Sequence, residues 1–147
     1  MNQEEADRDI PKLLATPAAK RFVSYEPALD AVDFRRWLYP RCPCGQKAPC
    51  DLHADLPRPA LSWLICGGES GPKARPFDIA WARSAVAQCK VAGVACFVKQ
   101  LGAKPEWNDP EPALSEPPYW MPIKLRDRAG ADPSEWPRDL RVQEWPE

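Results

Sequence analysis

Residues 61–99 constrain the fold more than any other part of this chain, because they hold two apolar strands separated by one amphipathic helix. Leu61–Cys66 has a continuous apolar end, which is typical of a strand buried on both faces of a parallel sheet. An amphipathic helix follows over 78–92, and Gly93 is suited to end it. Val94–Val98 is the second strand. This order predicts a βαβ unit with parallel strands.

The flanking segments predict further elements of an α/β fold. Residues 3–15 have the spacing of an amphipathic helix interrupted by a proline, and Arg21–Tyr25 is typical of a strand. Residues 28–38 indicate a loop and a short helix. With the βαβ unit, these segments predict about three parallel strands with helices.

We expect one domain over 1–102, with a Cys-rich loop insertion at 39–60, followed by a tail over 103–147. The tail holds nine prolines and four tryptophans, so we expect it to be extended and packed on the domain. Asp132–Glu135 within it is typical of one capped helical turn.

Charge and composition narrow the expected partners and compartment. The net charge is -1, which gives no reason to expect direct binding to nucleic acid or to an anionic membrane. No stretch is apolar enough to span a membrane, and the acidic start of the chain does not resemble a secretory signal. We therefore expect a cytoplasmic protein whose six cysteines are reduced.

Each predicted strand ends at polar or charged side chains. Ser24 and Glu26 follow the first strand, Glu69 the second, and Lys99 and Gln100 the third. The carboxyl ends of parallel strands meet at one edge, where functional groups of α/β proteins gather. A polar rim that contacts a ligand is one interpretation, and ordinary polar residues at strand ends are the other.

The turn after the second strand contributes further rim candidates, namely Gly67, Gly68, Glu69 and Ser70. Glycines allow a ligand to approach the backbone closely, although the spacing matches neither a dinucleotide-binding nor a P-loop pattern. A tight turn without any ligand remains the structural alternative.

The insertion at 39–60 carries a candidate metal site. Cys42, Cys44, Cys50 and His53 form a Cys₃His set suited to tetrahedral zinc, although the gap between the first two is shorter than usual. Free thiols in a loop are the alternative.

Three stretches together resemble a family of phage and prophage proteins of unknown function that is described as radical-SAM-like. The first covers residues 2–27 and the third covers 127–142. The second begins with the sequence Trp63-Leu-Ile-Cys-Gly-Gly-Glu-Ser-Gly-Pro72 and extends to Gln100. The resemblance implies a partial (βα) barrel in a bacterial host cell, with Glu26, Glu69, Lys99 and Gln100 at the barrel mouth.

In that family these stretches resemble the C-terminal half of a longer protein. The other half carries a C-x3-C-x2-C signature for a [4Fe–4S] cluster that binds S-adenosylmethionine, and the present sequence has no such signature. We therefore expect no radical chemistry from this chain alone. The cluster and S-adenosylmethionine are expected only if a missing N-terminal half completes the protein.

A sheet of about three strands leaves its edges unpaired, and such edges invite association. A separately encoded N-terminal half, a homodimer formed through the open edges, or the Trp-rich tail could cover them. One functional hypothesis is therefore a fragment of a radical-SAM-like protein that is inactive alone and depends on a partner half. The alternative is a non-catalytic, zinc-stabilised phage accessory binding module.

The zinc hypothesis makes a direct prediction. The purified chain should contain one zinc ion, and Cys50→Ser should lose it, because three ligands cannot close a tetrahedral structural site. Elemental analysis of both proteins measures this, and a parent chain purified without zinc would contradict the zinc-stabilised module.

Overall fold

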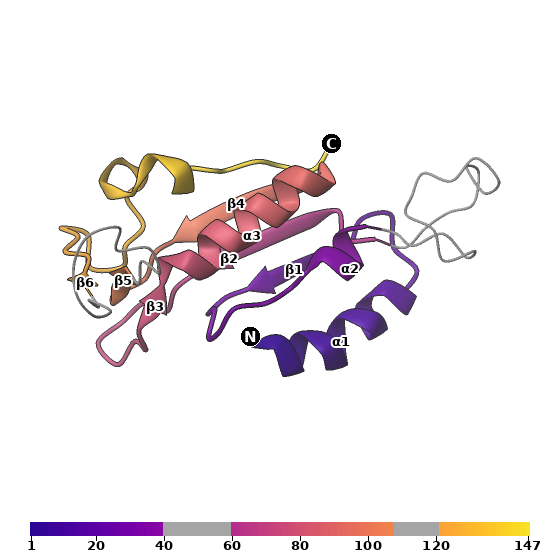
Figure 1. Cartoon of the computed structure of the whole chain (residues 1–147), viewed down its shortest axis with the longest axis horizontal. Helices are drawn as coiled ribbons and strands as arrows, with labels where there is room; N and C mark the ends of the chain where they lie inside the picture. The colour runs from indigo at the N-terminus through magenta and orange to yellow at the C-terminus, as the bar shows by residue number, and fades with distance from the viewer. Residues whose placement is uncertain (40–59, 108–120) are drawn as a thin grey trace, which may run out of the picture.

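The computed structural model describes residues 1–39, 60–107 and 121–147, and these form a mixed helix-and-sheet fold. The main sheet has three parallel strands in the order β1-β2-β4, namely Phe22–Tyr25, Trp63–Gly67 and Ala95–Gln100. Helix α3, Ile79–Ala92, connects β2 to β4 and lies across one face of the sheet (Figure 1). The predicted parallel βαβ unit is therefore confirmed. Within the described residues the sheet forms no closed barrel.

Local signals in the sequence explain where α3 begins and ends. The side chain of Asp78 accepts a hydrogen bond from the amide of Ala80, which satisfies one free amide of the first turn. Gly93 ends the helix in the left-handed conformation with φ of 68°, a region that glycine enters without steric cost. Both the N-cap and the stop lie where the sequence predicts them.

The N-terminal helix is also capped by its own sequence. Helix α1 spans Gln3–Ala15, and Asn2 and Glu5 form a reciprocal capping box at its start. Pro11 lies within this single helix rather than dividing it into two. Helix α2, Arg35–Leu38, is the short helix expected after the first strand. Among the described helices, none is sufficiently long and apolar to cross a membrane.

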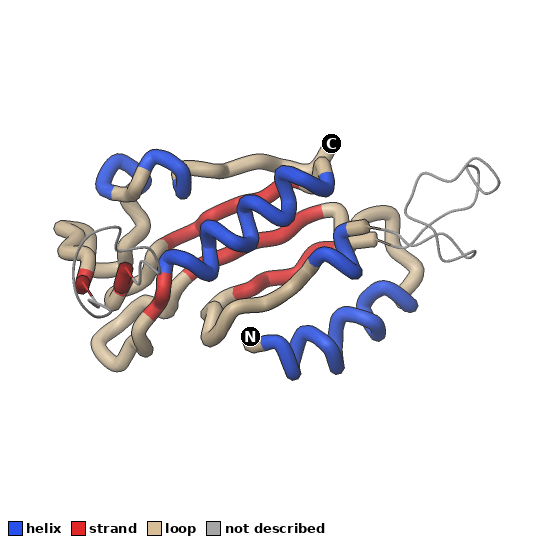
Figure 2. The backbone as a smooth tube through the Cα atoms, in the orientation of Figure 1, coloured by secondary structure: helices blue, strands red, loops and turns tan. Residues whose placement is uncertain are grey.

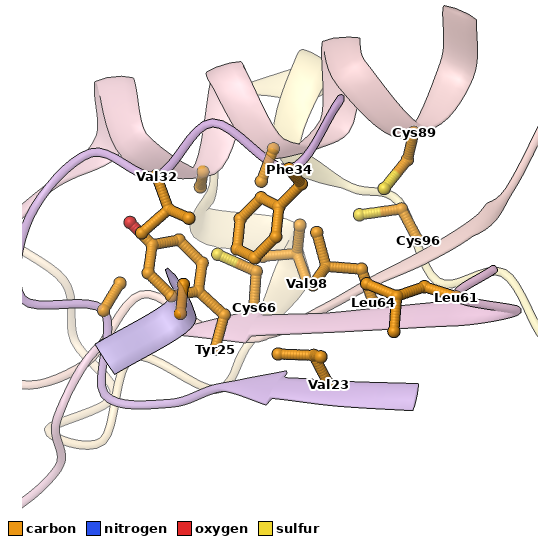
Figure 3. Close-up of a cluster of buried hydrophobic side chains, with 14 of the residues drawn as sticks. Val23, Tyr25, Val32, Phe34, Leu61, Leu64, Cys66, Cys89, Cys96 and Val98 are labelled. Atoms are coloured by element: carbon orange, nitrogen blue, oxygen red, sulfur yellow. The ribbon is translucent and has the colours of Figure 1, made fainter. Parts of the chain in front are cut away.

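The core lies between one face of the sheet and the helices. Alternate strand residues point into it, and the segment before α2 adds Val32 and Phe34 (Figure 3). The buried apolar side chains of the three strands are those of Val23, Tyr25, Leu64, Cys66, Cys96 and Val98. Tyr25 is held by a hydrogen bond from its hydroxyl to the carbonyl of Asp30, and the ring packs edge-on against Phe34 at 5.2 Å.

The opposite face of the main sheet carries no helix within the described residues (Figure 2). Its aromatic side chains come from all three strands: Phe22 lies 5.7 Å from Trp63, and Trp63 lies 6.1 Å from Phe97, between ring centroids. Phe22 is 51 % exposed. We call this surface the open face.

A second, smaller sheet, which the sequence did not predict, joins the tail to the domain. Its strands are β3, Phe77–Asp78, β5, Pro105–Trp107, and β6, Met121–Pro122, in the order β3-β5-β6. The two 3-10 helices of the tail are η2, Pro133–Glu135, and η3, Arg138–Leu140. Helix η2 is the capped turn predicted at 132–135, with the Asp132 side chain accepting from the amide of Ser134.

The tail contributes to the same core as the strands. Trp136 and Leu140 are buried, and the indole of Trp136 donates to the carbonyl of Gly130 at 3.0 Å. The amide of Leu101 also donates to the carbonyl of Gly130, so the tail around Gly130 lies against the loop after β4. Arg83 on α3 forms an ion pair with Asp139 at 2.6 Å.

Adjacent residues of β2 should differ in their contribution to stability. Leu64→Ala should reduce the free energy of unfolding by about 3 kcal/mol, because it opens a cavity in the core. Ile65→Ala should cost about 1 kcal/mol, because Ile65 faces the half-exposed open face. Urea denaturation of both variants measures the difference. Equal losses would contradict the two-face arrangement.

Candidate functional site

The carboxyl ends of β1, β2 and β4 bring several of the predicted rim residues together. The strands are in register, with Tyr25 opposite Cys66 and Cys66 opposite Val98. The register then shifts, so that Gly67 pairs with Gln100 and Lys99 is the extra residue of a bulge. Bulges re-aim side chains at sheet ends. Lys99, the extra residue of this bulge, extends toward Glu26, which follows β1.

Glu26 is the centre of this rim. Its Oε2 atom accepts a hydrogen bond from the Ser24 hydroxyl at 3.1 Å and lies 3.4 Å from the ammonium nitrogen of Lys99. The Glu26 side chain is 15 % exposed, whereas that of Lys99 is 56 % exposed. The carboxylate is therefore largely covered, and its cationic partner is in contact with solvent.

The second carboxylate oxygen of Glu26 differs from the first in its surroundings. Within the described residues, Oε1 is buried and receives no hydrogen bond. A buried acceptor left without a donor costs about 1–3 kcal/mol. Such atoms in native proteins call for an explanation, and a donor from a water molecule, a ligand or another chain satisfies the same requirement.

Gly67 provides the space in which this carboxylate lies. A Cβ atom at this position would be 2.7 Å from Glu26 Oε1 and 3.2 Å from the carbonyl oxygen of Gln100. Gly68 is packed more tightly, because a Cβ there would overlap the carbonyl of Leu101. The side chain of Gln100 donates to the carbonyl of Gly68 at 2.9 Å and holds this turn against β4.

Glu69 has a different environment from Glu26. Its carboxylate accepts from the backbone amide of Arg75 at 3.0 Å and from the guanidinium of the same residue at 2.9 Å. These hydrogen bonds lower the pKa of Glu69. Ser70 lies beside it on the exposed part of this turn. The structure therefore joins Ser24, Glu26, Gly67 and Lys99, while Glu69 is engaged by its own turn.

Sequence reasoning did not identify Arg75 as the partner of Glu69. The spacing of the two residues gives no signal, since the turn between them has no regular period. It also did not identify the open face, because β2 is apolar at every position from Trp63 to Cys66 and the sequence therefore indicated burial on both faces.

The three described cysteines lie in the core, with Cys66 next to the rim and Cys89 and Cys96 toward the amino ends of the strands. Burial raises the pKa of the Cys66 thiol, and a hydrogen bond with Cys96 raises the pKa of Cys89 (Figure 3). Groups of three or more His, Cys, Asp or Glu residues that could hold a metal ion do not occur in the described part of the chain. The predicted zinc ligands Cys42, Cys44, Cys50 and His53 lie outside the described residues.

Two surface depressions lie away from the rim. One, of about 650 Å³, is lined by Ser62, Ala95 and Trp145 among others, and therefore lies at the amino ends of the strands. The other, of about 510 Å³, lies between the start of α1 and α3 and is bordered by Asp33 and Gln88. Neither includes Glu26 or Lys99.

The fold and the rim define an α/β protein with a polar cluster at the carboxyl edge of a short parallel sheet. The chain belongs to the family described as "Protein of unknown function (DUF5131)", whose model matches residues 1–142. Neither the curated proteins nor the solved structures contain a match to this chain.

The two glycines of the turn should respond differently to alanine. Gly67→Ala should cost about 1 kcal/mol, because the end of the Glu26 side chain can move away. Gly68→Ala should cost about 3 kcal/mol, because the Leu101 carbonyl belongs to the backbone and cannot move away from the added methyl group. Urea denaturation distinguishes the two, and a Gly68→Ala chain as stable as the parent would contradict this packing.

Proposed function

We propose that this chain forms one wall of a radical-SAM-like (βα) barrel of phage origin, and that a separately encoded half supplies the remaining strands. The single observation that carries the proposal is the open face. A parallel sheet is normally covered on both faces, since its connections place helices or further strands there. Here α3 covers one face, while the other exposes half of Phe22.

The free edge of β1 supports the same proposal. Within the described residues β1 has β2 on one side and no strand on the other. An added strand would find unpaired amides and carbonyls there. It would also extend the open face at Phe22 and Ser24, which are the exposed residues of β1. The completing half is therefore expected to add at β1.

In this proposal the rim contacts a ligand. Among the described residues no group donates to the buried Oε1 atom of Glu26, so a ligand that offers an N–H or O–H group would satisfy it. Lys99 is solvent-exposed beside it and could contact an anionic group of the same ligand. The Ser24 hydroxyl positions the Glu26 carboxylate by donating a hydrogen bond to its other oxygen, Oε2.

The described cysteines do not fit the iron–sulfur cluster of a radical-SAM protein. A [4Fe–4S] cluster is held by cysteine thiolates, and the environment of Cys66 and Cys89 disfavours the thiolate. All three described cysteines are buried as core residues. The cluster and S-adenosylmethionine therefore belong to the completing half in this proposal, and the chain contributes rim residues and a sheet face.

Co-expression tests the proposal. The tagged chain is purified together with the product of the reading frame directly upstream, and the complex is analysed for iron and acid-labile sulfide. We expect a stable complex that contains both, and a tagged chain that contains neither when expressed alone. Recovery of the tagged chain without the upstream product, and without iron, would overturn the proposal.

Two exposed apolar residues provide a matched pair for locating the interface. Phe22→Asp should abolish co-purification, because it places a charge in an apolar interface on the open face. Val91→Asp should leave it unchanged, because Val91 is 78 % exposed on α3, which covers the other face. Pull-down yields measure both. Equal loss with the two variants would contradict an interface on the open face.

A further inference from the structure

Residues 142–147, which we call the C-terminal strap, lie along the edge of β4 that β2 does not use (Figure 2). Phe97 and Gln143 face each other as an antiparallel bridge. The amide of Val98 donates to the carbonyl of Val142 at 2.8 Å, and the amide of Glu144 donates to the carbonyl of Cys96 at 2.9 Å. The strap therefore acts as a short fourth strand.

Two side chains of the strap fit specific groups of the sheet. The carboxylate of Glu144 accepts from the amide of Cys96 at 3.0 Å, so it satisfies an edge amide that a backbone carbonyl would otherwise bind. The ring of Trp145 turns over the open face, 4.9 Å from Trp63 and 5.4 Å from Phe97 between centroids. The indole of Trp63 in turn donates to the carbonyl of Glu144 at 2.9 Å.

The strap is held by hydrogen bonds of which several are exposed to solvent. Two main-chain bonds and the bond from the Cys96 amide to the Glu144 carboxylate join it to β4. The exposed bonds are those from the Trp63 indole to the carbonyl of Glu144 and from Lys20 to the carbonyl of Pro146 at 3.1 Å. Trp145 is 68 % exposed, although its ring contacts Trp63 and Phe97. Short chain ends with few buried contacts open at low free energy. Gln143, Glu144 and Trp145 also lie beyond the residues that the family model matches.

We propose that the β4 edge, together with Trp63 and Phe97, is a strand-binding site whose occupant in the free chain is the C-terminal strap. The partner is an extended polypeptide segment that runs antiparallel to β4 and carries an acidic residue followed directly by an aromatic residue. Such a segment displaces the strap by strand addition, in which main-chain hydrogen bonds give affinity and side chains give specificity.

The chemistry of the partner follows from the groups that the strap now satisfies. The Cys96 amide requires an acceptor, and a carboxylate forms a stronger hydrogen bond with it than a neutral group. The Trp63 and Phe97 rings require an aromatic ring at the next position of the added strand. Trp63 and Phe97 belong to the open face, but the β4 edge is distinct from the β1 edge and the rim, so this site goes beyond the function proposed above.

A labelled peptide with the sequence of residues 139–147 tests the site. The chain truncated after Arg141 should bind it. The full chain should bind it about tenfold more weakly, because the strap competes at an effective concentration of the order of millimolar. Peptides carrying the Glu144→Gln or Trp145→Ala change should bind the truncated chain about tenfold more weakly. Fluorescence anisotropy measures all four affinities.

Variants of the full chain give a second measurement that does not depend on truncation. Trp145→Ala should increase amide hydrogen exchange at Val98 and tighten peptide binding, because it loosens the strap. Glu147→Ala is the matched control, since Glu147 is an exposed residue at the end of the strap, beyond Trp145, and its change should leave both unchanged. Equal peptide binding by the parent and Trp145→Ala, with equal exchange at Val98, would overturn the proposal. Binding that is insensitive to the peptide's Glu or Trp would overturn the stated partner chemistry.

Discussion

Strand β2 pairs in parallel with β1 on one side and with β4 on the other, and the rest of the molecule depends on this double pairing. Parallel pairing places the carboxyl ends of all three strands at one edge of the sheet. It also requires a crossover connection, which α3 supplies between β2 and β4. The register of these strands therefore determines both the position of the rim and the face that α3 buries.

The register shift after Cys66 arranges the polar rim at the end of this sheet. It makes Lys99 an extra residue in β4 and pairs Gln100 with Gly67. Because Gly67 has no side chain, the carboxylate of Glu26 occupies the space above β2 instead. A rim built on strand ends is positioned by the rigid sheet beneath it, so its geometry is more constrained than that of a free loop.

The two edges of the main sheet are treated differently. The strap occupies the outer edge of β4 with an acidic and an aromatic residue, whereas β1 has no strand beside its outer edge within the described residues. Natural sheets protect their edges because unpaired edges associate with other chains. A strand added at β1 would meet no strand there within the described residues, whereas a strand added at β4 would first have to displace the strap.

The elements that could be predicted from the sequence are those held by neighbouring residues. Helix α3 is bounded by Asp78 and Gly93. The Asp78 side chain accepts a hydrogen bond from an amide of the first turn, and Gly93 adopts the left-handed conformation that ends the helix. The apolar runs that flank α3 predicted β2 and β4 as parallel strands, and the rim residues followed from the ends of those strands. The small sheet of β3, β5 and β6 could not be predicted in this way, since its strands are two or three residues long.

The sequence by itself determined the βαβ unit, the helix caps and which strands end in polar residues, because these depend on the spacing of residues close together in the chain. Tertiary structure decided that Glu26 lies over Gly67, that Arg75 engages Glu69 and that the strap covers β4. Glu26 and the strap find their partners far away in the chain, and Arg75 reaches Glu69 across an irregular turn. No local period encodes such contacts, so they form only when the whole sheet brings these groups together.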